Sequence, residues 1–174
     1  MLHCFAGTVD EAIEAVSRGY RISVPSSVGY RKKFADVARR VDLSSIVVET
    51  DSPYHSPFVG HWKAAKKAAR RSVPSDCLSR TDRDCWVAEQ QREVFFAEID
   101  RRYPDLEFDL SRDGVTETVS ARQHLANDDR RRENEPTFVR CAATEIATLK
   151  GVDGRAVCEA TTANARKLFP RLFE

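Results

Sequence analysis

Two ionisable side chains stand where short apolar segments end, and together they could bind a metal ion. His3 lies within the apolar segment Leu2–Phe5, just before a glycine turn, and Asp51 follows the β-branched run Ile46–Val48. Functional side chains of a parallel barrel project from the carboxyl ends of its strands, so these two could converge although they are far apart in sequence. Imidazole nitrogen and carboxylate oxygen together suit Zn²⁺, Mn²⁺ or Mg²⁺. A carboxylate beside a metal can also orient or deprotonate an attacking water molecule.

Each residue also has an ordinary structural explanation. A single histidine in an apolar strand is more often a hydrogen-bonded core residue than a ligand. An aspartate just after a strand is commonly a turn former or a helix cap. The metal site is therefore a hypothesis that depends on both residues reaching the same place.

The segments that would position these residues alternate between strand and helix patterns. Residues 8–11 form a Thr-x-x-Glu capping box, which predicts a helix with Ile13 and Val16 on its inner face, ended by Gly19. Apolar residues at helical spacing predict a second helix over residues 34–41. Short buried strands are expected over residues 2–5, 21–24 and 45–50, an order that is typical of parallel βα units.

The end of the chain is expected to be helical. Asn134 is a good N-cap, with Pro136 in the first turn, for a helix that Gly151 closes. A last helix is predicted from Asp153 to just before Pro170, with apolar residues along one stripe.

The segment between these parts differs in composition. It opens with a basic run (Lys63, Lys66, Lys67, Arg70, Arg71), and residues 81–103 have the pattern of an amphipathic helix with Val87 or Ala88, Phe95, Phe96, Ile99 and Tyr103 as its apolar stripe. Residues 106–108 could form a short strand, and the polar residues 109–132 a mobile loop. We therefore expect barrel units over residues 1–58, a charged insertion over 59–133 and C-terminal barrel helices over 134–174.

Composition narrows the class of protein. The 174 residues are 41% hydrophobic and 32% charged with a net charge of +1, so any attraction to phosphate must come from local patches. No apolar run is long enough for a membrane span, and no signal peptide is visible. The five cysteines are odd in number and irregularly spaced, which argues against a disulfide framework or a zinc knuckle. They fit small buried hydrophobic residues in a reducing intracellular compartment, whether cytoplasm, nucleus or organelle.

Five segments, taken in order, resemble the TatD family of metal-dependent deoxyribonucleases. They are His3–Gly7 (His-Cys-Phe-Ala-Gly), Gly19–Ser23, Glu49–Tyr54 (Glu-Thr-Asp-Ser-Pro-Tyr), Asn134–Pro136 and Asn164–Phe169 (Asn-x-x-x-Leu-Phe). The resemblance covers residues 1–58 and 130–173, and the ordered set is far more specific than any single segment.

The resemblance implies the last three βα units of a TIM barrel, an α/β fold, and hydrolysis of DNA phosphodiesters with bound Mg²⁺, Mn²⁺ or Zn²⁺, two ions in the complete enzyme. It makes His3 and Asp51 metal ligands and places Asp51 where water is activated. Glu49 stands two positions earlier on the same side of its strand, and we interpret it as a hydrogen-bonded supporting residue. Arg130, Arg131 and Arg132 are candidate contacts to the DNA backbone, whereas most of the rest of the insertion is expected to be solvated surface. The family motif requires no ligand at His55 or His61.

Two departures from the family leave alternatives open. The ligands that the family supplies upstream of His3 are missing, so we expect a truncated gene product or half of a two-piece assembly. With only two ligands, the chain alone should bind divalent ions weakly. Residues 58–133 also replace a short family loop. A non-catalytic remnant that binds DNA or a protein partner, or a hydrolase of another ester such as aminoacyl-tRNA, remains possible on the same scaffold.

Overall fold

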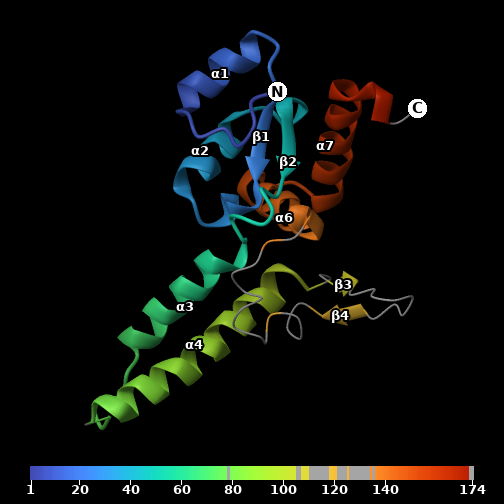
Figure 1. The fold of residues 1–174 in the computed structure, drawn as a ribbon. Helices are drawn as coiled ribbons and strands as arrows, with labels where there is room; N and C mark the ends of the chain where they lie inside the picture. The colour runs from blue at the N-terminus through green and yellow to red at the C-terminus, as the bar shows by residue number, and fades with distance from the viewer. Residues whose placement is uncertain are drawn as a thin grey trace. The chain divides into compact units, whose positions relative to one another are not determined.

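The chain divides into two compact units. One comprises residues 1–57 and 133–174, and the other residues 58–132. The computed structural model describes residues 1–77, 79–104, 107–109, 118–120, 125, 134 and 136–172 (Figure 1). Arg130, Arg131 and Arg132 lie outside the described residues.

The first unit is built around two parallel strands. β1 (Ile22–Pro25) pairs with β2 (Ile46–Glu49) in a register that runs from Ile22 opposite Ile46 to Pro25 opposite Glu49. Leu2 extends this sheet by a parallel bridge to Ile22, held by backbone hydrogen bonds to Arg21 and Ser23 of 2.8 and 3.0 Å. The predicted alternation of strand and helix is therefore confirmed from the first helix to β2. The strand predicted over residues 2–5 is reduced to the bridge at Leu2, and residues 3 and 4 form a turn.

The helices between these segments begin where the sequence predicts, but one of them turns a different face inward. α1 (Val9–Ser17) begins with the expected capping box between Thr8 and Glu11. Ala12 is fully buried in this helix, whereas Ile13 is 44% exposed, so the predicted inner face is wrong for Ile13, although Val16 packs partly buried against the core as predicted. α2 (Lys32–Arg40) buries its predicted apolar residues Phe34, Val37 and Ala38.

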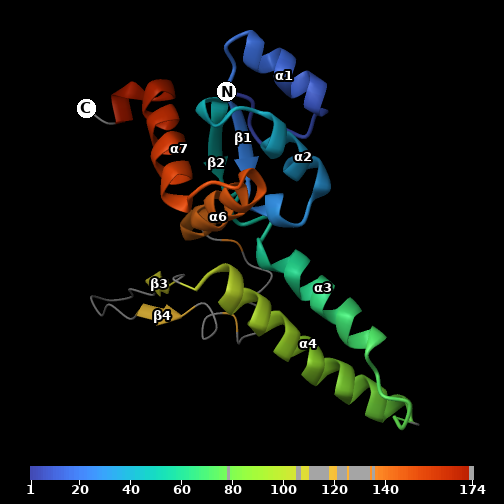
Figure 2. The same ribbon diagram turned by 180° about the vertical axis from the view of Figure 1, so that it is seen from behind.

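Two further helices complete the first unit. α6 (Val139–Lys150) contacts both strands and α2, and α7 (Gly154–Leu168) packs beside β2 (Figures 1 and 2). Gly151 ends α6 in a left-handed conformation, as predicted. The common core contains Ile22, Val24, Val28, Phe34, Val37, Ile46, Ile146 and Val157.

The predicted role of Asn134 as a helix N-cap is wrong. A short 3-10 turn (Pro136–Phe138) precedes α6, and Phe138 occupies the cap position without a side-chain hydrogen bond. The Asn134 side chain is buried and bonded elsewhere, to the loop that follows β2. A long-range contact thus replaces the local one that the sequence suggested.

The second unit pairs two helices side by side. α3 (Phe58–Arg71) packs against α4 (Arg80–Arg102), and β3 (Glu107–Asp109) pairs antiparallel with β4 (Thr118–Ser120) (Figure 1). The predicted stripe on α4 is largely confirmed, since Val87, Phe95, Ile99 and Tyr103 are buried. The basic run belongs to the exposed face of α3, a helix that the sequence analysis did not anticipate, and β4 lies within the predicted loop.

The cysteines do not share one environment. All five are free, and only Cys141 is buried; Cys85 and Cys158 are exposed, while Cys4 and Cys77 are intermediate. The expectation that most of them are buried hydrophobic residues is therefore wrong. Within the described part of the chain, no helix combines the length and apolarity that crossing a membrane requires.

Candidate metal centre

The two strands present alternate residues to opposite faces of the sheet. Ile22, Val24 and Ile46 belong to the core that the helices cover. Ser23 and Glu49 project from the opposite face, where the Ser23 hydroxyl donates a hydrogen bond to Glu49 Oε2. Polar groups therefore gather on the face away from the helices, at the carboxyl end of β2.

His3, Glu49 and Asp51 meet on this face. His3 Nε2 lies 3.1 Å from Glu49 Oε2 and 3.1 Å from Asp51 Oδ1. The side chains of Glu49 and Asp51 are 13% and 10% exposed, whereas His3 is 66% exposed. The structure thus brings together the two residues that the sequence singled out as ligands, and adds a second carboxylate.

The Glu49 carboxylate is also held in place by hydrogen bonds. Its Oε1 accepts a 2.7 Å hydrogen bond from the backbone N–H of Cys4, which ties β2 to the segment that carries His3. Burial raises the pKa of Glu49, and the charge of Asp51 raises it further, although the bond from Ser23 and the nearness of His3 act in the opposite direction. The interpretation of Glu49 as a hydrogen-bonded residue is confirmed.

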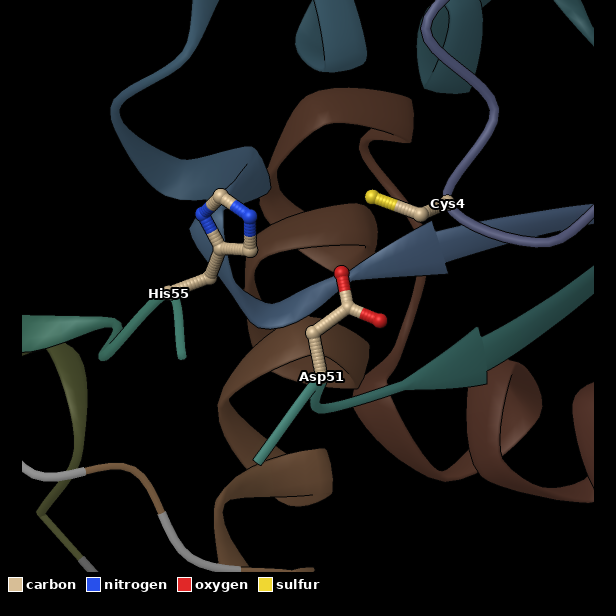
Figure 3. Close-up of side chains that lie close together, drawn as sticks. All are labelled: Cys4, Asp51 and His55. Atoms are coloured by element: carbon tan, nitrogen blue, oxygen red, sulfur yellow. The ribbon is translucent and has the colours of Figure 1, made fainter. Parts of the chain in front are cut away.

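A second group of donors surrounds Asp51. The side chains of Cys4, Asp51 and His55 face one another, and one donor atom from each lies within 4.8 Å of the others (Figure 3). Asp51 Oδ2 is buried and has no hydrogen-bond partner. Burial raises the pKa of the Cys4 thiol to about 12, with further contributions from the neighbouring carboxylates. In this arrangement the thiol is neutral and the carboxylate retains an unused acceptor.

The backbone at these three positions is unusual. Cys4, Asp51 and His55 have φ angles of 41°, 55° and 62°, and they are the only non-glycine residues with positive φ in the described ranges. This conformation costs an L-residue roughly 1–2 kcal/mol. Such residues cluster at functional sites, where the surrounding structure holds them in place.

Buried hydrogen bonds fix the loop that carries Asp51 and His55. The side-chain amide of Asn134 donates to the carbonyl oxygens of Thr50 and Tyr54. The Ser52 hydroxyl donates to the Asn134 carbonyl at 2.6 Å, and the Ser26 hydroxyl donates to that of His55 at 3.0 Å. Asn134 is therefore a positioning residue of this loop.

Asn164, the first residue of the Asn-x-x-x-Leu-Phe segment, fixes the backbone at the beginning of β2 by similar side-chain hydrogen bonds. Its side-chain amide donates to the carbonyls of Leu43 and Ile46 at 2.9 and 2.8 Å. It is 3% exposed, close to the 4% of Asn134. The two motif asparagines thus hold β2 at its beginning and just beyond its end.

Sequence reasoning missed Cys4 as a donor and gave no support to His55. No recognised spacing relates Cys4, Asp51 and His55, and their meeting depends on three loop conformations. His61, the other histidine considered, belongs to α3 in the second unit, where its Nε2 lies 3.4 Å from the Tyr103 hydroxyl.

Comparisons with known proteins agree on one family. A family model described as TatD related DNase matches residues 1–170. The uncharacterized metal-dependent hydrolase MJ1582 of Methanocaldococcus jannaschii is 37% identical over 60 residues, which cover 34% of this chain and 24% of that protein. Human deoxyribonuclease TATDN3 is 24% identical over 172 residues, 99% of this chain and 37% of the human protein.

A solved structure shows the same fold. A hydrolase TatD family protein from Entamoeba histolytica matches 95% of this chain with a TM-score of 0.51 and 15% sequence identity. The match covers 40% of that protein, so the chain spans well under half the length of each of these relatives.

Proposed function

This chain belongs to the TatD-related DNase family, and on that basis we propose that it forms part of the active site of a metal-dependent hydrolase that cleaves DNA phosphodiesters. The observation that carries the proposal is the convergence of His3, Glu49 and Asp51 beside the end of β2. In this proposal the Leu2 bridge, β1 and β2 mark the last three βα units of a TIM barrel, whose active sites lie at the carboxyl ends of the strands.

The residues present fit a divalent metal ion. They offer an imidazole nitrogen and carboxylate oxygens, which suit Mg²⁺, Mn²⁺ or Zn²⁺. His3 Nε2 lies 3.1 Å from a carboxylate oxygen of each of Glu49 and Asp51, and one donor atom from each of the three residues lies within 4.8 Å of the others, which is close enough to surround one cation. His3 and Asp51 would hold the ion, which would polarise the phosphodiester and make a water molecule more acidic.

The protein residues have distinct roles in this proposal. Asp51 would hold the ion and would accept the proton of the attacking water, and His3 would hold the ion. Glu49 already accepts bonds from the Cys4 backbone and the Ser23 hydroxyl, so it keeps the two segments together rather than acting as the base. The remaining ligands, including those of a second ion, would come from the other βα units of a complete barrel.

DNA contact is assigned to basic residues outside this cluster. Lys63, Lys66, Lys67 and Arg70 are exposed on α3, and charges of this kind bind phosphates without reading sequence. Replacing Lys66 and Lys67 by alanine should weaken binding to single-stranded DNA and flatten its dependence on salt concentration, leaving the chemical step unchanged. Arg131→Ala is expected to act in the same way.

Nuclease activity on single-stranded DNA with added Mg²⁺ tests the catalytic proposal. It is measured on this chain and on a fusion that supplies the remaining βα units from a family member. Asp51→Asn should reduce turnover at least roughly 100-fold, because it removes both charge and basicity. His3→Ala should also strongly reduce nuclease activity, and a higher Mg²⁺ concentration should partly restore it. Asp36→Asn, which removes an exposed carboxylate on α2, is the matched control and should change nothing.

Near-normal turnover of Asp51→Asn in an active protein would refute the site assignment. DNA binding without hydrolysis in either form would instead favour the non-catalytic alternative. Cleavage of another ester but not of DNA would move the proposal to a different substrate on the same scaffold.

A further inference from the structure

We propose that Cys4, Asp51 and His55 form a separate metal site that selects Zn²⁺ or Co²⁺ over Mg²⁺. This chain supplies all three protein ligands of the site and needs none from another polypeptide. The proposal deepens the proposed function and rests on it insofar as both use Asp51. The metal site does not depend on any hydrolytic step, so an experiment can refute the site and the proposed function independently.

The geometry suits a small tetrahedral ion. Zinc binds sulfur at about 2.3 Å and nitrogen or oxygen at about 2.0–2.2 Å, which places neighbouring donors roughly 3.5 Å apart. The donor atoms of the three residues already lie within 4.8 Å of one another, so side-chain rotations of about an ångström would close the site. Their side chains face a common space (Figure 3).

The two oxygens of Asp51 are available to different partners. Oδ1 lies 3.1 Å from His3 Nε2, on the side shared with Glu49. Oδ2 is buried, has no hydrogen-bond partner and belongs to a side chain that is 10% exposed. A carboxylate held in this way can serve the His3 cluster through one oxygen and the Cys4–His55 pair through the other.

The local framework supports a built site. All three residues adopt a left-handed backbone conformation, which is costly for residues other than glycine. Hydrogen bonds hold those conformations on both sides: Glu49 accepts from the Cys4 N–H, and Ser26 donates to the His55 carbonyl. The donors are therefore placed before any ion arrives, which lowers the ordering cost of binding.

The donor set decides which ion is preferred. The ion would displace the proton of the Cys4 thiol on binding. Thiolate and imidazole favour Zn²⁺ and Co²⁺, whereas Mg²⁺ requires oxygen ligands and retains several of its waters. Three protein ligands leave one position open, as in catalytic zinc sites. The cluster of His3, Glu49 and Asp51 offers more oxygen and suits harder ions. The sequence predicts weak metal binding because it identifies only His3 and Asp51 as ligands. Cys4 and His55 are two additional donors beside Asp51, so we expect tighter binding.

Cobalt titration of the reduced 174-residue chain tests the proposal directly. Co²⁺ bound to a thiolate shows charge-transfer absorption in the near ultraviolet, and tetrahedral Co²⁺ shows strong visible bands. We expect both to saturate at one ion per chain, to survive excess Mg²⁺ and to disappear when Zn²⁺ is added.

Four variants separate this site from other sources of the signal. Cys4→Ser should remove the charge-transfer band, and His55→Leu should weaken Co²⁺ binding at least roughly tenfold. Cys158→Ser, at an exposed cysteine on α7, is the matched thiol control and should leave the spectrum unchanged. His3→Ala should also retain the charge-transfer band, because His3 belongs to the neighbouring cluster.

Three results would overturn the proposal. They are a thiolate band that persists in Cys4→Ser, an unchanged affinity in His55→Leu, and loss of the band in His3→Ala. If circular dichroism shows that Cys4→Ser does not fold, the His55→Leu affinity decides. A cobalt site without nuclease activity would refute only the proposed function, and activity without the cobalt site would refute only this inference.

Discussion

Replacing Asn134 by alanine should both destabilise the chain and loosen the metal centre. The Asn134 amide is buried and donates to the carbonyls of Thr50 and Tyr54, which flank the turn that carries Asp51. Alanine would leave these two carbonyls without that donor. The turn would then lose two of the hydrogen bonds that fix the loop carrying Asp51 and His55.

The size of the effect follows from the two lost bonds. A hydrogen bond whose other partner stays buried costs about 1–3 kcal/mol when it is removed. The Thr50 carbonyl keeps a 3.3 Å hydrogen bond from the Ser26 hydroxyl, and Tyr54 is 73% exposed to water, so we expect a loss of about 1–3 kcal/mol in total rather than the upper limit. Metal affinity should fall at least roughly tenfold, since the donors would no longer be held in place.

Asn164→Ala is the matched control. Its amide also donates to two carbonyls and is equally buried, but it holds the beginning of β2, away from the cluster. Urea unfolding should show similar losses of stability for the two variants. Cobalt titration should show weaker binding only for Asn134→Ala.

Equal metal affinity in the two variants would refute the reasoning, because Asn134 would then stabilise the fold without positioning the site. A loss of less than about 0.5 kcal/mol in Asn134→Ala would refute the energetic estimate, since that is the lower limit for one net hydrogen bond.

Two further predictions concern stability away from the site. Contacts with two arginines of α4 lower the pKa of Glu98 from 4.5 to about 2, so its carboxylate stabilises the fold above pH 4.5 and that contribution is lost as pH falls toward 2. Glu98→Gln should therefore lower the free energy of unfolding at pH 7 by under about 1 kcal/mol, because solvent screens the pair. Urea unfolding measures this difference, which should vanish near pH 2; a pH-independent difference would contradict the prediction. Gly29→Ala should lower the free energy of unfolding by about 1–3 kcal/mol, because the added Cβ would lie 2.8 Å from Cδ of the buried Glu145. Gly154→Ala is the control and should be tolerated, because its Cβ would meet nothing within 4 Å. Equal unfolding midpoints for the two variants would show that Glu145 moves aside.

The order of elements in the first unit was predictable from the sequence. Strand and helix patterns have fixed periods, so the apolar residues of β1, α2 and β2 identify these elements without knowledge of their partners. The capping box at Thr8 and the glycine at position 151 mark helix ends through local hydrogen bonds and backbone freedom. The pairing of His3 with Asp51 as candidates also came from sequence, through their places beside strand ends.

Periodicity could not decide which face of a short helix turns inward when small and large residues compete. On α1, Ala12 is fully buried in the core, whereas the larger Ile13 is 44% exposed. The same limit applies to α3, where basic residues dominate the composition while Phe58, Ala65 and Ala69 form the buried side.

The full composition of the metal cluster was decided only by the tertiary structure. Cys4 and His55 reach Asp51 through loop backbones with positive φ, and no sequence period describes such turns. Asn134 looked like a helix cap because caps are local, yet its amide bonds to residues far away in the sequence. Local patterns encode local hydrogen bonds, whereas the direction of a side chain in a loop depends on partners that only folding brings near.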